Sequence, residues 1–154
     1  MISEHASPLA ALGGVDSGGQ NVYVAQIANQ LAQRGYQVDV YTRRDQETLP
    51  DVVEFINRVR VIHVAAGPPR FVPKEELLPY MDEFARQLIV SWRRGRQRYD
   101  VAHANFWTSG VVAMRLKAAL GLPFAVTFHA LGRVRRLHQG EADRFPPERP
   151  AIEE

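Results

Sequence analysis

Apolar and polar residues along the chain follow two spacings, one typical of helices and one typical of extended strands. The clearest helical stretch has apolar residues three and four positions apart, which places them on one face of a helix. These residues are Val24, Ile27, Ala28 and Leu31. Ser17 and Gln20 form a capping-box pattern before them, and Gly35 stands where a helix commonly ends.

Helical spacing returns in residues 77–92 and again in residues 112–120. Because proline breaks a hydrogen bond inside a helix, the first of these two helices is expected to begin near Pro79. Ser109 is expected to cap the second helix, and Gly121 is expected to end it. The stretch Pro147–Glu154 reads as the beginning of one more helix.

Four short runs rich in β-branched and aromatic residues alternate with these helices and predict strands. The runs are Gln37–Tyr41, Val59–Val64, Val101–Ala104 and Phe124–Phe128. Together with a first strand before the first helix, the order is β-α-β-β-α-β-α-β. This order predicts an α/β fold with a Rossmann-like, doubly wound and mostly parallel sheet.

Both ends of the chain look cut. Only Met1, Ile2 and Ser3 remain of the strand that should precede the first helix. Because parallel sheets bury their strands on both faces, losing part of a central strand should lower stability. The alternative is a small complete domain whose sheet begins at Gln37, but its capped first helix would then have no strand leading into it.

Composition narrows the class of protein further. The chain has 154 residues, of which 45% are apolar and 23% charged, as expected for one globular domain. No apolar run approaches the ~20 residues of a membrane span, and the N-terminus lacks the pattern of a secretory signal. There is no cysteine, which excludes disulfides and thiolate sites. We predict a cytoplasmic protein, and the net charge of +2 is too small to predict a nucleic-acid partner.

The glycine-rich stretch Gly13–Asn21 lies between the strand remnant and the first helix. Glycines let a ligand approach the backbone, and the free amides of a helix N-terminus favour an anion. A phosphate or diphosphate site is therefore predicted, with a flexible surface loop as the alternative. The stretch has neither the dinucleotide pattern Gly-x-Gly-x-x-Gly nor a Walker motif, and the ribose-binding acid of dinucleotide enzymes is missing.

Four segments occur in one order along the chain. They are Gly18-Gly19-Gln20-Asn21-Val22-Tyr23-Val24, Lys74-Glu75-Glu76-Leu77, His103-Ala104-Asn105-Phe106-Trp107-Thr108-Ser109-Gly110 and Thr127-Phe128-His129-Ala130-Leu131-Gly132. Together they resemble the N-terminal domain of glycosyltransferase family 4, a GT-B family, in its sucrose-phosphate synthase-like and mycothiol-synthase-like branch. The resemblance spans nearly the whole chain.

The resemblance implies a retaining sugar transfer from a nucleotide-diphosphate sugar, such as UDP-glucose, to a small and phosphorylated sugar acceptor. It implies no metal and no cofactor. In the family the nucleotide sits mostly on a C-terminal domain, which these 154 residues do not supply. We therefore expect a single acceptor-side domain over residues 1–154, with little or no activity alone.

The resemblance also assigns roles to the glycine motif and to one histidine. Gly18 and Gly19 would approach the donor diphosphate and the acceptor, and Gln20 would hydrogen-bond acceptor hydroxyls. His129 would lie next to the reacting sugar and stabilise developing charge. From the residues alone, His129 follows a strand directly, at the edge where open α/β sheets bind ligands.

Several basic residues are candidates for the acceptor phosphate. Lys74 matches a family lysine with this contact, although a solvated lysine is the alternative reading. Arg133 follows the His129 motif, and a guanidinium suits a phosphate because it donates two parallel hydrogen bonds. Arg135 and Arg149 are weaker candidates, for which an exposed basic helix is the alternative.

His103, Phe106 and Trp107 are assigned to the acceptor pocket, with core packing as the alternative for the two aromatic residues. Family members often carry His-Tyr where this chain has Asn105-Phe106, and many carry a hydroxyl residue where it has Ala130. Both departures concern the identity of the acceptor. His5 and His63 have no partners at metal-binding spacing, so no role is assigned to them.

Three rival functions remain from the sequence. A non-catalytic phosphosugar-binding module would bind without turnover, and a nucleotide-sugar 2-epimerase would share the GT-B architecture. The separate acceptor cations Lys74 and Arg133 argue against the epimerase. A dinucleotide-dependent oxidoreductase is disfavoured by the absent glycine pattern and acid.

Overall fold

The computed structural model describes residues 1–10, 18–95 and 98–154. Its strands are β1 (Val38–Arg43), β2 (Val52–Ile56), β3 (Val59–Val64), β4 (Ala102–Asn105) and β5 (Phe124–Thr127). β3 lies between β1 and β2, parallel to the first and antiparallel to the second, and β4 pairs with β5 in parallel. The predicted α/β class with a mostly parallel sheet is confirmed.

The first residues of the chain join these two groups of strands. Ile2 forms parallel bridges with Tyr41 of β1 and with Ala104 of β4. Its N–H donates to the carbonyl oxygen of His103 at 2.8 Å, and its own carbonyl oxygen accepts from the N–H of Asn105 at 2.9 Å. The sheet order is therefore β2-β3-β1-Ile2-β4-β5. Of the predicted strand remnant Met1, Ile2 and Ser3, Ile2 is the residue that forms the bridges.

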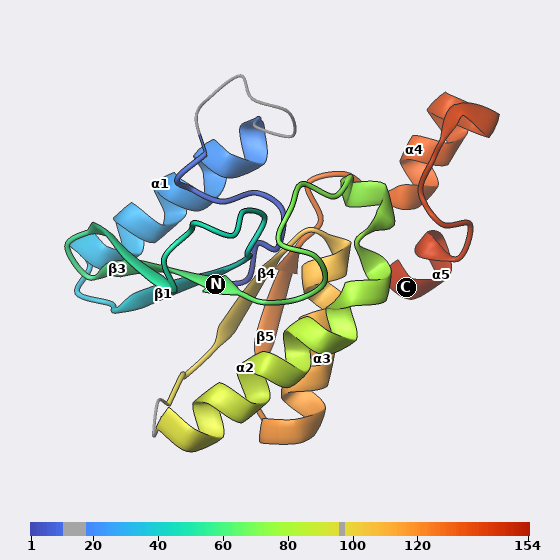
Figure 1. Ribbon diagram of the computed structural model, residues 1–154. Coiled ribbons are helices and arrows are strands. Elements are labelled where there is room, and N and C mark those ends of the chain that lie inside the picture. Colours follow the sequence, from blue (N-terminus) through green and yellow to red (C-terminus); the bar gives the residue numbers. More distant parts are fainter. Residues whose placement is uncertain (11–17, 96–97) are drawn as a thin grey trace.

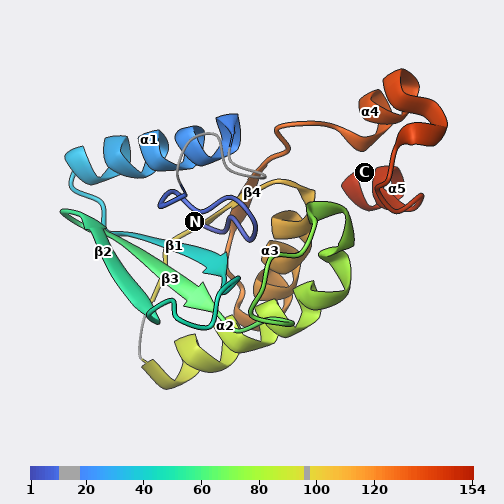
Figure 2. The same ribbon diagram turned by 45° about the horizontal axis from the view of Figure 1, so that its top comes forward.

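Helices cover both faces of the sheet, as Figures 1 and 2 show. α1 (Gly19–Gln33) lies on one face, where Val24 and Ala28 pack against Val40 and Val59. α2 (Met81–Gly95) and α3 (Trp107–Leu120) lie on the other face, and a second, larger core fills the space between them and the sheet. The sheet is consequently buried on both sides at its centre, as parallel sheets require.

The start of α1 is set by glycine and asparagine in the described part of the chain. Gly18 is the N-cap residue, and its N–H donates to the Oδ1 atom of Asn21 at 2.9 Å. Ser17, together with Gly13 and Gly14 of the predicted phosphate loop, lies outside the described residues. At the other end, Gly35 adopts a φ of 92°, as expected for a helix terminator.

The prediction that Ser109 caps α3 is wrong. The N-cap residue is Phe106, and Ser109 lies inside the first turn, where its hydroxyl donates to the carboxylate of Glu4. Glu4 is more than 100 residues away in sequence. The residues around Ser109 therefore gave no sign that its hydroxyl would bond to Glu4 and would not cap the helix. The expected helix end at Gly121 is confirmed by its left-handed φ of 71°.

One strand was not predicted. β2 lies at the sheet edge, where its residues are exposed or half-buried, and its run Val52-Val53-Glu54-Phe55-Ile56 was missed although it is rich in β-branched and aromatic residues. It reaches β3 through a tight turn in which Arg58 has a φ of 66°. Before α2, residues 74–80 form two 3-10 turns, Lys74–Glu76 and Leu78–Tyr80, which places the start of α2 near Pro79 as predicted.

The C-terminal segment lies beside the start of α3 (Figure 1). It contains α4 (Gly132–Gln139), a 3-10 turn at Gly140–Ala142 and α5 (Arg149–Glu153), so the helix predicted near the end of the chain is confirmed. Phe145 is buried against Phe106 and Trp107, with ring centroids 5.8 Å and 6.4 Å away. None of the described helices is long and apolar enough to cross a membrane.

Replacing Ile2 by alanine should lower the free energy of unfolding by about 2–5 kcal/mol, because Ile2 is 1% exposed at the centre of the sheet. The matched control is Leu137→Ala, since Leu137 is 79% exposed and should contribute less than about 0.5 kcal/mol. Urea unfolding measures both variants. If Ile2→Ala and Leu137→Ala lower the free energy of unfolding equally, the Ile2 side chain is not needed to hold the two halves of the sheet together.

Candidate functional site

The strands that run in parallel end together at one edge of the sheet, and the candidate site lies there. Ser3, Glu4 and His5 follow Ile2 at the centre of the sheet, Phe106 follows β4, and His129 comes two residues after β5. The N-terminus of α1 reaches the same edge. Carboxyl ends of parallel strands are where open α/β sheets bind ligands.

Asn105, the last residue of β4, connects the parts of this edge. Its side chain is fully buried, and its Nδ2 atom donates to the carbonyl oxygens of Ile2 and His103, both at 3.4 Å. Its Oδ1 atom is 3.2 Å from the Nε2 atom of His129, and its backbone oxygen accepts from Gln20 Nε2 at 3.3 Å. Sequence analysis noted Asn105 only as a departure from relatives and missed this role.

His129 is held in an unusual backbone conformation, with a φ of 59°. Non-glycine residues rarely adopt this conformation, and where they do it often marks a functional position. The ring packs edge-on against Tyr23, with 4.9 Å between centroids. Desolvation, together with the nearby His5, lowers the pKa of His129, while Glu4 opposes the shift.

A neutral His129 has one ring nitrogen that donates and one that accepts. Because the Oδ1 atom of Asn105 can only accept, Nε2 of His129 carries the proton and Nδ1 keeps its lone pair. His129 is exposed to solvent at this edge.

Gly18 and Gly19 lie exposed at the start of α1. A Cβ atom added at either position would meet no atom of the described residues within 4 Å, so packing against this part of the chain does not explain these glycines. Their absence of side chains leaves the first amides of a 15-residue helix open to an anion. Gln20 is tied to the sheet by its Nε2 atom, which donates to Ser3 Oγ and to the Asn105 carbonyl oxygen, each at 3.3 Å.

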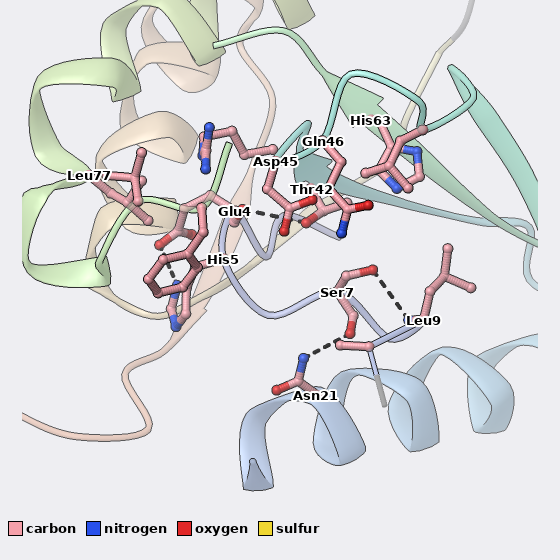
Figure 3. Close-up of a pocket in the computed structure, with 15 residues that line it drawn as sticks. Glu4, His5, Ser7, Leu9, Asn21, Thr42, Asp45, Gln46, His63 and Leu77 are labelled. Atoms are coloured by element: carbon pink, nitrogen blue, oxygen red, sulfur yellow. Dashed lines mark hydrogen bonds and ion pairs between the residues drawn. The ribbon is translucent and has the colours of Figure 1, made fainter. Parts of the chain in front are cut away.

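A cavity of about 210 Å³ opens beside this edge (Figure 3). Its walls come from residues 4–10, from the start of α1, from the loop after β1 and from the segment 71–77. Polar side chains that line it include Ser7, Asn21, Thr42, Asp45 and Gln46. The lining also contains His5 and His63, to which the sequence assigned no role.

Lys74 is half-buried in the 3-10 turn between Val72 and Leu77, two residues that line the cavity. The Arg43 side chain braces the same wall, donating to the carbonyl oxygens of Pro68 at 2.6 Å and Arg70 at 2.5 Å. Burial lowers the pKa of Arg43 below its usual value. The segment that carries Lys74 is thus fixed next to the cavity.

The three arginines predicted to bind phosphate have different surroundings. Arg133 is exposed on α4. Arg135 forms an ion pair with Asp143 at 3.2 Å, and its guanidinium lies 4.8 Å from the centre of the Phe145 ring.

Arg149 is only 1% exposed and is not part of an exposed basic helix. It pairs with Glu153 at 2.7 Å and donates to the carbonyl oxygen of Ala130 at 2.5 Å. Its guanidinium also lies 4.9 Å from the Phe106 ring centre and 4.3 Å from that of Phe145. These contacts make Arg149 the link between α5 and the loop that follows His129.

The residues predicted to form the acceptor pocket lie deeper than expected. His103 is the second residue of β4, and its Nε2 atom is 2.8 Å from Thr127 Oγ1. Phe106 and Trp107 are 5% and 2% exposed, within the aromatic cluster around Phe145. Phe106 has a φ of 85°, so the backbone is strained at both Phe106 and His129.

The described residues contain no group of three or more His, Asp or Glu side chains that could hold a metal ion.

Replacing Arg149 by alanine should lower the free energy of unfolding by roughly 3–5 kcal/mol, because the carboxylate of Glu153 would be left buried without its partner. The matched control is Arg133→Ala, which removes an exposed arginine and should change stability by less than about 0.5 kcal/mol. Thermal and urea unfolding measure the difference. Similar stability of the two variants would contradict a structural role for Arg149.

Acid should weaken the fold in part through Glu4, whose carboxylate is 1% exposed. Burial alone would raise the pKa of Glu4, but electrostatic attraction to the neighbouring His5 and hydrogen bonds from His5, Ser109 and Thr108 outweigh it and lower the pKa. A lowered pKa stabilises the fold above the ordinary glutamate pKa, and this stability is lost as pH falls through the lower value in the folded state.

Glu4→Gln should therefore cost about 1–3 kcal/mol of unfolding free energy at pH 7 and less at acid pH. Urea unfolding between pH 7 and pH 3 measures this, with the exposed Glu141→Gln as control. If Glu4→Gln lowers the free energy of unfolding by the same amount at every pH in this range, protonation of Glu4 does not contribute to the acid sensitivity of the fold.

Several known proteins resemble this chain in sequence and in structure. The chain is 41% identical over 143 residues to a D-inositol 3-phosphate glycosyltransferase of Corynebacterium diphtheriae, covering 93% of this chain and 34% of that protein. It is 42% identical over 147 residues to D-inositol 3-phosphate glycosyltransferase 1 of Catenulispora acidiphila, covering 95% and 34%. The chain thus spans about a third of the length of these relatives.

A solved structure of sucrose-phosphate synthase from Thermosynechococcus elongatus superposes on 99% of this chain and 38% of its own, with a TM-score of 0.90 and 32% identity. This match confirms the predicted fold, and it agrees with the predicted branch of the family. The Glycosyltransferase Family 4 domain matches residues 17–153, nearly the whole chain. The chain belongs to glycosyltransferase family 4.

Proposed function

We propose that this chain is the acceptor-side domain of a retaining glycosyltransferase. The enzyme would move a sugar from a nucleotide-diphosphate sugar, such as UDP-glucose, to a hydroxyl of a small phosphorylated sugar. The observation that supports this most directly is the position of Asn105. It holds Gln20, at the glycine end of α1, and His129, after β5, at the same edge of the sheet.

The donor diphosphate would lie against the start of α1. Gly18 and Gly19 leave space there, and the unpaired amides of a long helix attract an anion. The Nε2 atom of Gln20 already has two partners in the chain. Its side-chain oxygen would therefore be the atom that accepts a hydrogen bond from an acceptor hydroxyl.

His129 would stand beside the reacting sugar. Its lowered pKa keeps the ring neutral near pH 7, so Nδ1 would accept a hydrogen bond from a sugar hydroxyl while Nε2 stays on Asn105. Such a fixed dipole stabilises charge that develops during transfer without reorganising. Closure of a second domain over this edge would exclude water, and we propose that residues outside these 154 bind the nucleotide.

The acceptor would occupy the cavity beside the edge. Its volume is below the ~300 Å³ at which pockets for drug-sized ligands begin, which suits a single sugar ring. We assign its phosphate to Lys74 and Arg133. Arg135 and Arg149 would support this site through their pairs with Asp143 and Glu153, with Phe106 and Trp107 behind the pocket wall.

Isothermal titration calorimetry with fructose 6-phosphate and D-inositol 3-phosphate tests the acceptor assignment on the purified chain. We expect one of them to bind, and Lys74→Ala and Arg133→Ala each to weaken binding by about 10- to 100-fold, the value of a hydrogen bond to a charged group. Arg136→Ala is the control, because Arg136 is an exposed arginine on the same helix as Arg133.

UDP-glucose should bind weakly or not at all to this chain alone. If a folded chain binds neither sugar phosphate, the acceptor assignment is wrong. If Lys74→Ala and Arg133→Ala both bind the sugar phosphate as tightly as the unmodified chain, other residues bind the phosphate.

A further inference from the structure

Tyr23, His103 and Thr127 form a polar cluster between the first two turns of α1 and the strands β4 and β5. The Nε2 atom of His103 is 2.8 Å from Thr127 Oγ1, and the hydroxyl oxygen of Tyr23 is 3.4 Å from the same Thr127 atom. All three side chains are half-buried. The proposed function gives none of them a role.

Elsewhere α1 packs on the sheet through apolar side chains. Val24 and Ala28 belong to the same apolar cluster as Val40 of β1 and Val59 of β3. Polar groups between a helix and a sheet cost free energy unless they are hydrogen-bonded, and apolar side chains pack there without that cost. Helix packing therefore does not explain a hydroxyl and an imidazole at the end of α1 that lies nearest to His129.

The ring of Tyr23 connects this polar cluster to His129. The centroids of the two rings are 4.9 Å apart and their planes lie at 82°, which is the edge-to-face arrangement that aromatic rings prefer. The Nε2 atom of His129 is also 3.2 Å from Asn105 Oδ1. A ring contact and a hydrogen bond from two different residues leave the His129 side chain little freedom to turn.

Thr127 holds the hydroxyl of Tyr23 in place. A threonine hydroxyl donates one hydrogen bond and accepts others, so Thr127 can bind Tyr23 and His103 at the same time. Thr127 is the last residue of β5, and in the sheet it pairs with Asn105. The ends of two neighbouring strands thus support His129 twice, through the Asn105 side chain and through Tyr23.

We propose that Tyr23 is a positioning residue for His129 and that Thr127 and His103 hold Tyr23 in place. This inference rests on the proposed function, because it takes His129 as the group beside the reacting sugar. Tyr23 lies about one helical turn after Gly19, at the end of α1 where the donor diphosphate would bind. The same helix would therefore both meet the diphosphate and fix the orientation of His129.

The role of Tyr23 is tested on the ¹⁵N-labelled chain without any ligand. Long-range ¹H–¹⁵N NMR spectra show which ring nitrogen of a histidine carries the proton, and spectra across a pH range give its pKa. In the unmodified chain we expect an Nε2–H tautomer of His129 with a pKa below the usual histidine value, chiefly because of desolvation. Tyr23→Ala should raise this pKa, because water replaces the tyrosine ring, and should weaken the preference for the Nε2–H tautomer.

Tyr23→Phe and Thr127→Val test the hydroxyl contact separately from the ring contact. Each keeps a side chain of similar size and removes one hydroxyl. Each should change the His129 spectrum in the same direction as Tyr23→Ala, but by less. The double variant should differ little from Thr127→Val, because both substitutions remove the same contact. Tyr36→Ala is the control, since Tyr36 is 60% exposed in the segment after α1.

Glu4 and His5 also act on the pKa of His129, but they are the same in every variant, so a difference between variants reports the substituted residue. If Tyr23→Ala keeps the far-UV circular dichroism spectrum, tautomer and pKa of the unmodified chain, this inference is wrong and the proposed function stands. If Tyr23→Ala changes His129 but Tyr23→Phe and Thr127→Val do not, the roles given to Thr127 and His103 are wrong.

Two further outcomes concern the proposed function itself. An Nδ1–H tautomer of His129 in the unmodified chain contradicts its hydrogen bond to Asn105 and overturns the proposed role of His129 together with this inference. If the folded chain binds no sugar phosphate in calorimetry, the acceptor assignment is wrong, and the NMR spectra still decide whether Tyr23 positions His129.

Discussion

The two halves of the sheet are held together by backbone hydrogen bonds to the first residues of the chain. Ile2 pairs with β1 on one side and β4 on the other, and it is almost completely buried. Because the direction of this strand is parallel to its neighbours, the residues after it emerge at the carboxyl edge of the sheet. That geometry delivers Glu4 and His5 to the place where β4 and β5 also end.

At that edge, buried polar side chains fix the groups that remain exposed. Asn105 orients His129 and anchors Gln20, while Glu4 orients His5 through a carboxylate held by α3. Both anchors are almost fully buried, so their hydrogen bonds are hard to exchange for water and the exposed groups keep defined directions.

The C-terminal segment adds a second set of supports. Arg149 lies among aromatic rings and pairs with Glu153, which in turn accepts from the N–H of Gly132 at 2.7 Å. A Cβ at Gly132 would lie 3.0 Å from the Arg149 side chain, so a larger residue would force that buried side chain to shift by a few tenths of an ångström. The loop between His129 and α4 is thereby fixed from both ends, and Arg133 is presented on the outer side.

Local pattern in the sequence was enough for the alternation of strands and helices, the C-terminal ends of α1 and α3 and the position of His129 after β5. These features depend on neighbours a few residues away, through apolar spacing and the freedom of glycine. The edge strand β2 is also a local pattern, because it pairs with the adjacent β3, but it was not recognised. The sequence could not reveal the role of Asn105, the hydrogen bonds that Thr108 and Ser109 donate to Glu4, or the burial of Arg149. Those depend on partners up to about a hundred residues away, which only the folded chain brings within hydrogen-bonding distance.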